Sequence, residues 1–146
     1  MNSDTNQATF LLNKDFIFLA EDDTDDVEFF AEAVKGIQPT IELRVAHSGK
    51  KAITFLENLP DQDLPGMIVL DYNLPEINGQ EILAFLSGKE RYSIIPKAVW
   101  STSSSPYYEK ICLENGADAY FVKPSNLSGI ISVAEQMIDL MNKHTC

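Results

Sequence analysis

The chain has 146 residues, of which 45% are hydrophobic and 23% are charged, a length and composition that fit one globular domain. Its 22 acidic residues outnumber its 11 basic ones and give a net charge of −11, which argues against a surface that binds nucleic acid through its phosphates. Two cysteines, Cys112 and Cys146, are too few for a disulfide framework and favour a reducing compartment.

The N-terminal residues, MNSDTNQAT, lack the cationic start and the apolar stretch of a signal peptide. No apolar run in the chain approaches the roughly 20 residues that span a bilayer. We therefore expect a cytoplasmic protein that does not bind a membrane. Residues 1–13 are predicted to form a flexible tail, and residues 14–146 a single domain.

Strand-like and helix-like patterns alternate along that domain. Strands are predicted over residues 15–20, 40–46, 67–71, 97–101 and 119–122. The first, third and fourth are nearly continuous apolar runs, as in strands buried on both faces, whereas 40–46 alternates like a half-exposed edge strand. The pattern predicts an α/β fold: a five-stranded, doubly wound parallel sheet in the flavodoxin-like order 2-1-3-4-5, with helices on both faces.

Apolar residues at helical spacing occupy the segments between the strands. They lie within residues 27–34, 52–59, 82–86, 108–112 and 126–142. Ser105 followed by Pro106 is typical of a helix cap and first turn. We interpret each apolar stripe as core and not as a binding site, because the sheet needs helices to cover it.

Several predicted strands end on residues with specific chemistry. Glu21 and Asp22 follow the first strand, Asp71 ends the third, Ser101 ends the fourth, and Lys123 follows the fifth. Each has an ordinary alternative explanation: acidic residues suit a helix first turn. Asp71 can form a local turn with Asn73, Ser101 can be a polar strand end in a run of hydroxyl residues, and Lys123 can be solvated. Because parallel strands share one carboxyl edge, where open sheets bind ligands, their coincidence favours a common site.

Three neighbouring carboxylates raise one another's pKa unless a cation compensates, and the candidates are Lys123 and a metal. An anionic, partly open site built from oxygen ligands suits Mg²⁺ or Mn²⁺. Asp71 can then act as a nucleophile toward phosphorus and form an aspartyl phosphate. The metal and Lys123 would neutralise the transferred charge, and Ser101 would donate to a phosphoryl oxygen.

The motifs that carry this site resemble the receiver domain of two-component response regulators. They are LAEDD, VLDYNLPEINGQEIL, the P-x4-S spacing from Pro96 to Ser101, and GADAYFVKP. The resemblance covers nearly the whole chain after the tail and implies a receiver of the chemotaxis-Y type. It implies that Asp71 accepts a phosphoryl group from a sensor histidine kinase or a histidine phosphotransfer protein.

The resemblance also implies a role for each neighbour of Asp71. Asp22 and Asp71 would bind Mg²⁺ (or Mn²⁺) directly, Glu21 would act through water, and Asn73 would offer its backbone carbonyl. Asp23 is expected to be peripheral. The downstream positions comprise the switch residues Ser101 and Tyr120, the phosphate-pairing Lys123, and a Lys123–Pro124 bond that resembles the family's cis peptide.

Two positions depart from the family pattern: Trp100 replaces a smaller aliphatic residue, and Ser125 an apolar or aromatic one. We expect neither to touch the phosphoryl chemistry, although both weaken expectations about the signalling face. Tyr107, Tyr108 and Tyr120 are compatible with either an exposed aromatic patch near that face or partial core. His47 and His144 are expected to be ordinary surface residues.

On this interpretation the protein is not a turnover enzyme but a phosphoryl acceptor that assists its own phosphorylation and slow dephosphorylation. We expect a stand-alone receiver that acts through a protein partner as a relay, a phosphate sink or a diffusible regulator. Two other classes fit less well. A dehalogenase-type phosphatase needs a second aspartate where Asn73 stands, and a flavin carrier needs a phosphate loop where EDDTDD stands.

Overall fold

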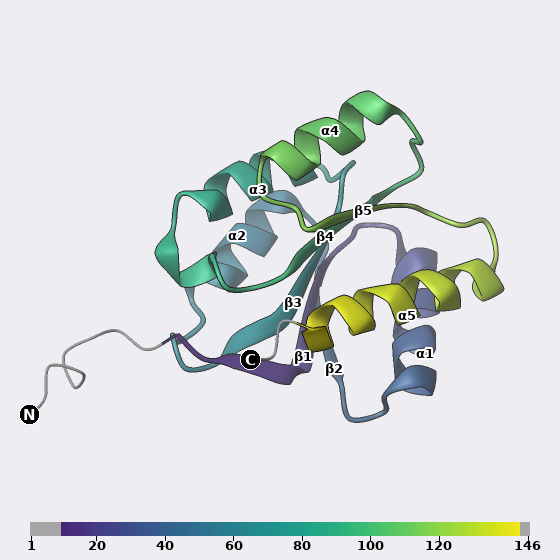
Figure 1. Cartoon of the computed structure of the whole chain (residues 1–146), viewed down its shortest axis with the longest axis horizontal. Helices are drawn as coiled ribbons and strands as arrows, with labels where there is room; N and C mark the ends of the chain where they lie inside the picture. The colour runs from purple at the N-terminus through teal and green to yellow at the C-terminus, as the bar shows by residue number, and fades with distance from the viewer. Residues whose placement is uncertain (1–9, 144–146) are drawn as a thin grey trace, which may run out of the picture.

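The computed structural model describes residues 10–143 (Figure 1). Most of the predicted tail, residues 1–9, lies outside the described residues, as do His144 and Cys146. The strands are β1 (Leu12–Ala20), β2 (Glu42–Ala46), β3 (Leu64–Asp71), β4 (Lys97–Ser101) and β5 (Ala119–Val122). The helices are α1 (Thr24–Ile37), α2 (Gly49–Glu57), α3 (Gly79–Ser87), α4 (Pro106–Glu114) and α5 (Leu127–Lys143), with a short 3-10 turn, η2 (Glu90–Tyr92), before β4.

All five strands pair in parallel in the order β2-β1-β3-β4-β5, as the sequence predicts. The alternating strand, β2, is an edge strand. β1 and β3 each begin three residues earlier than predicted, because Leu12 and Asn13 pair with Leu64 and Pro65 before a register shift. The last residues of the predicted tail therefore belong to the sheet.

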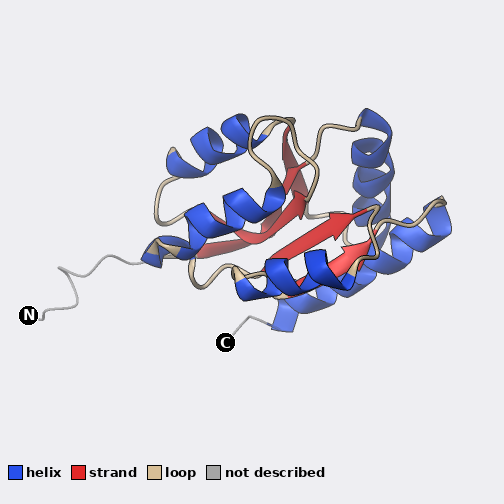
Figure 2. Cartoon of the chain, turned by 90° about the horizontal axis from the view of Figure 1, so that it is seen from above, coloured by secondary structure: helices blue, strands red, loops and turns tan. Residues whose placement is uncertain are grey.

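The sheet is covered on both faces, which confirms the predicted layers (Figures 1 and 2). One core lies between the sheet and α2, α3 and α4, and includes Phe16, Phe18 and Cys112. The other lies under α1 and α5 and includes Phe30 and Trp100. Within residues 10–143 no helix is long and apolar enough to cross a bilayer.

Side-chain caps fix where the helices near the carboxyl edge begin. The carboxylate of Asp23 accepts from the backbone N–H of Asp26 at the start of α1. Ser48 and Asn78 cap α2 and α3 in the same way. Ser105 caps α4, with Pro106 in the first turn as predicted. A carboxylate cap also suits the positive end of the helix dipole, so the acidic run after β1 is partly explained by structure alone.

Candidate functional site

The carboxyl edge of the sheet gathers the predicted residues. Asp71 is the last residue of β3, Glu21 follows β1 directly, and Lys123 follows β5. Backbone hydrogen bonds continue past the strands and set their height: Glu21 N donates to Ala46 O at 2.9 Å, and Lys123 N donates to Ser101 O at 2.7 Å. The side chains of three separate chain segments therefore project from one edge, as parallel strand order requires.

The ammonium group of Lys123 lies at the centre of the site. Its Nζ is 2.8 Å from Oε1 of Glu21, 3.0 Å from Oδ2 of Asp26 and 3.3 Å from Oδ2 of Asp71. The lysine side chain is only 9% exposed, so solvent screens these contacts weakly. Lys123 thus lies beside Asp71 and beside Glu21, one member of the predicted acidic pair.

The expected cis peptide is wrong: the Lys123–Pro124 bond is trans. The trans form is the lower-energy isomer of such bonds in general. The ammonium group still reaches Asp71 from this backbone. The aim of Lys123 into the site therefore comes from its position at the end of β5.

Three carboxylates offer a place for a cation. Oxygen atoms of Glu21, Asp22 and Asp71 all lie within 4.8 Å of one another. They line a pocket of about 550 Å³ together with Asn73, and Asp22 is exposed to it from the solvent side. A cluster of hard oxygen donors that is open on one side fits Mg²⁺ or Mn²⁺, which keep several waters in protein sites.

The electrostatics of the site show why a cation fits. Burial of Glu21, reinforced by its hydrogen bond to Asp71 and by repulsion between the two groups, raises the pKa of its carboxyl to about 8. Burial alone favours the neutral form of Lys123, but the carboxylates of Glu21, Asp71 and Asp26 outweigh it and raise the pKa of the amine. One fixed ammonium therefore faces several carboxylates, and additional positive charge would relieve their repulsion.

Asn73 and Asp71 form the local turn that the sequence had left as an alternative. The backbone N–H of Asn73 donates to Oδ1 of Asp71 at 3.1 Å, while Oδ2 faces Lys123. Asn73 also lines the pocket that holds the three clustered carboxylates. The turn and the site are thus compatible, because the same bond orients the Asp71 carboxylate.

The two predicted switch residues, Ser101 and Tyr120, share a hydrogen-bonding neighbour. Ser101 is fully buried, and its Oγ accepts from the backbone N–H of Ser103 at 3.1 Å. The hydroxyl of Tyr120 donates to the carbonyl oxygen of Ser103 at 2.7 Å. Ser101 is absent from the described residues that line the pocket, where its neighbour Thr102 is present. Ser101 and Tyr120 are therefore linked through one residue of the β4–α4 loop.

The three tyrosines combine the two alternatives that the sequence left open, an exposed aromatic patch and partial core. Tyr107 is 65% exposed, whereas Tyr108 and Tyr120 are half-buried. The rings of Tyr72 and Tyr108 lie 4.7 Å apart, which joins the residue after Asp71 to the first turn of α4. The aromatic cluster is thus partly core and partly surface.

Sequence reasoning missed two contacts with Lys123. Asp26 was treated only as part of an acidic run, although its place in the first turn of α1 was a signal that it faces this edge. Trp100, expected to stay clear of the phosphoryl chemistry, has Lys123 Nζ 5.1 Å from the centre of its ring, so it contacts the lysine of the site. Its indole packs against Phe30 under α1 at 5.4 Å. The larger side chain thus forms a wall of the lysine site.

Comparisons with known proteins agree with this geometry. The family described as the response regulator receiver domain matches residues 17–135. The two-component response regulator ORR11 of rice (Oryza sativa subsp. indica) is 32% identical over 108 residues, which are 73% of this chain and 71% of the relative.

Two solved structures are also similar. The phosphorylated cyanobacterial phytochrome response regulator RcpA superposes with a TM-score of 0.80 at 25% identity, over 90% of this chain and 96% of that chain. The Mn²⁺-bound form of the response regulator Rcp1 gives a TM-score of 0.74 at 27% identity, over 83% of this chain and 89% of that chain.

Proposed function

The chain belongs to the response regulator receiver domain family of two-component signalling, and we propose that Asp71 is its phosphoryl acceptor. The donor would be a phosphohistidine of a sensor histidine kinase or a histidine phosphotransfer protein. The observation that carries the proposal is the position of the Lys123 ammonium, 3.3 Å from Asp71 and 2.8 Å from Glu21. A strand-end carboxylate beside a fixed cation is suited to receive an anionic group.

In the proposed transfer, an oxygen of the Asp71 carboxylate attacks phosphorus. An O–P bond forms while the P–N bond of the phosphohistidine breaks, and the electron pair of that bond leaves with the imidazole nitrogen. Asn73 N–H holds one carboxylate oxygen and Lys123 faces the other, so the nucleophile is oriented before the donor arrives. Lys123 then balances negative charge on the phosphoryl oxygens.

A divalent cation fits the same site. Mg²⁺ or Mn²⁺ would be held by Asp22, Asp71 and the carbonyl oxygen of Asn73, with Glu21 acting through water. When bound, such an ion supplies charge neutralisation at phosphoryl oxygens. The cluster of carboxylate oxygens within 4.8 Å supports this proposal, as does the Mn²⁺-bound form of Rcp1.

The switch we propose runs through Ser103. In the structure the Ser103 N–H donates to Ser101 and its carbonyl oxygen accepts from Tyr120. If Ser101 turned to donate to a phosphoryl oxygen, Ser103 N–H would lose its acceptor and the β4–α4 loop would shift. Tyr120 would then lose or change its partner. Hydrogen bonds to charged groups contribute roughly 1.5 to 3 kcal/mol each, enough to bias such a two-state element.

The output of this switch would be binding to another protein. We propose that the receiver works in the cytoplasm and signals by binding a partner protein. Its chemistry would be self-phosphorylation and slow dephosphorylation, without turnover of an independent substrate.

Mass spectrometry after incubation with acetyl phosphate tests the proposal. Wild-type protein should gain one phosphoryl group in the presence of Mg²⁺ and none with a chelator. Asp71→Asn should gain none. Asp139→Asn, which removes a carboxylate from the exposed side of α5, should behave like wild type. Metal-independent labelling, or labelling that persists in Asp71→Asn, would show that the acceptor is assigned to the wrong residue.

A further inference from the structure

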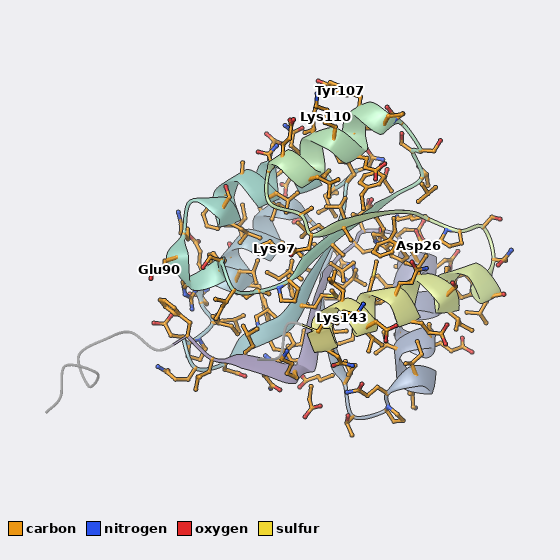
Figure 3. The ribbon with its side chains drawn as sticks, viewed as in Figure 1. Asp26, Glu90, Lys97, Tyr107, Lys110 and Lys143 are labelled. Atoms are coloured by element: carbon orange, nitrogen blue, oxygen red, sulfur yellow. The ribbon has the colours of Figure 1, made fainter. Side chains whose placement is uncertain are left out.

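Asp26 is the partner of Lys123 that neither the cation site nor the acceptor chemistry uses. Its Oδ2 lies 3.0 Å from Lys123 Nζ, a distance between those of Glu21 and Asp71. The Asp26 side chain is 26% exposed. Figure 3 shows Asp26 at the end of α1 that faces the chain leaving β5. The contact therefore joins the first turn of α1 to the lysine at the end of β5.

The local backbone holds Asp26 in this place. The Asp26 N–H donates to Oδ1 of the helix cap Asp23 at 3.0 Å, which fixes the first turn of α1. Asp26 is not among the described carboxylates whose oxygens approach closely enough to share a cation, which are Glu21, Asp22 and Asp71. Asp26 thus adds a negative charge and a lysine contact to the site without adding a metal ligand.

Phosphorylation would change the balance around Lys123. In the resting structure the ammonium contacts the carboxyl groups of Glu21, Asp26 and Asp71. An aspartyl phosphate carries more negative charge than a carboxylate and offers three strong acceptor oxygens. Lys123 would turn toward those oxygens and away from Asp26. The Asp26 carboxylate would then lose its cation and face a like charge.

We propose that Asp26 is a positioning residue that holds Lys123 in the resting state and thereby opposes the phosphorylated state. This inference rests on the proposed phosphoryl acceptance by Asp71. Asp26 competes with the phosphoryl group for a single ammonium, so it sets how far the equilibrium at Asp71 lies toward phosphorylation. Its loss would leave the acceptor intact and shift that equilibrium toward the phosphorylated side.

The test is equilibrium binding of fluoroberyllate, a phosphoryl analogue that bonds to aspartate and is not consumed, at saturating Mg²⁺. Asp26→Asn should bind it about fivefold to tenfold more tightly than wild type, the factor expected for exchanging one partly screened ion pair. Asp25→Asn is the matched control. Asp25 lies in the same helical turn, is exposed and lines the same pocket, but its side chain makes no hydrogen bond or ion pair within residues 10–143. Its variant should stay within about twofold of wild type.

A second measurement separates positioning from a general defect. Mg²⁺ affinity without fluoroberyllate should fall about twofold to fivefold in Asp26→Asn. The site loses a negative charge, and Lys123 then pairs more strongly with the carboxylates that would bind the metal. The proposal therefore predicts opposite changes in Asp26→Asn: tighter binding of fluoroberyllate and weaker binding of Mg²⁺. A distorted or partly unfolded site would weaken both. Asp26→Ala should reproduce the pair, and thermal unfolding of each variant verifies that it is folded.

The outcomes are distinct. Equal analogue affinity in Asp26→Asn and Asp25→Asn, with normal binding by wild type, overturns the role of Asp26 alone. Weaker analogue binding in both Asp26 variants while they remain folded also overturns it. If wild type does not bind fluoroberyllate, or if Asp71→Asn still binds it, the proposed function is overturned and this inference with it.

Discussion

In the absence of metal, Glu21→Gln should be more stable than wild type at neutral and alkaline pH. This advantage should be smallest at acidic pH. The wild-type carboxyl has a pKa of about 8 in the fold, raised from its ordinary value of 4.5 by burial and by Asp71. Between these pH values the folded state binds more protons than the unfolded state. The contribution of the Glu21 carboxyl to stability is therefore complete below about pH 4.5 and is lost as pH rises through about 8.

The size of the effect follows from that difference in pKa. Each unit corresponds to about 1.4 kcal/mol, so raising the pH from about 5 to about 8 should cost wild type on the order of 3 kcal/mol of unfolding free energy. Glu21 is fully buried, so solvent does not screen the effect. Glutamine keeps the shape and stays neutral at every pH. For a domain of this size, roughly 3 kcal/mol corresponds to a difference in Tm on the order of 10 °C.

The assay is thermal unfolding of wild type and Glu21→Gln across this pH range with a chelator present. The quantity of interest is the difference in Tm between the two proteins, because it cancels the pH response of the other acidic groups. Glu28→Gln, at an exposed position on α1, controls for loss of a surface carboxylate. Saturating Mg²⁺ should shrink the difference, since the ion stabilises the ionised site. A Tm difference that stays constant with pH would refute this account of Glu21.

Three further outcomes are expected. Trp100 is the single tryptophan, and Lys123 lies 5.1 Å above its ring, so intrinsic fluorescence should change when Mg²⁺ and fluoroberyllate draw the ammonium away; an unchanged spectrum on saturation contradicts the predicted lysine movement. Arg91→Met should lower the free energy of unfolding, measured by urea titration, by about 2 kcal/mol, because the guanidinium donates to carbonyl oxygens of Leu56 in the last turn of α2 and of Leu59 just after it. A loss near zero would mean that solvent replaces these bonds. In a Cys146→Ser background, Cys112 should react slowly with thiol reagents until urea unfolds the chain, because burial raises the pKa of its thiol to about 11; fast labelling of the native protein would disprove this.

The sequence predicted the centres of the strands better than the residues at which they start. Apolar runs identified the centres of β1, β3 and β4, since both faces of these strands are buried. The starts of β1 and β3 were missed. Polar residues such as Asn13 and Lys14 carry no strand signal, and the pairing of Leu12 and Asn13 depends on backbone hydrogen bonds with a distant segment.

The same division holds at the site. Glu21, Asp71 and Lys123 were found because each stands at a strand end, and parallel order brings strand ends to one edge. The contacts of Asp26 and Trp100 with Lys123 were missed, since they depend on how α1 packs on the sheet and on where one long side chain points. The isomer of the Lys123–Pro124 bond was also predicted wrongly. The expectation of a cis bond came from the family resemblance alone, and no local sequence pattern supported it.

The order of apolar runs and turn residues along the chain determined the α/β class, the strand order and the edge that carries the chemistry. Such patterns are local, and each strand end reports its own position. Which carboxylates share the one ammonium group, and which neighbour Ser101 and Tyr120 have in common, was decided only by tertiary packing. Apart from the local bond between Ser103 and Ser101, these contacts join residues distant in the chain over about 3 Å. At such distances the balance of burial, charge and hydrogen bonding selects one arrangement.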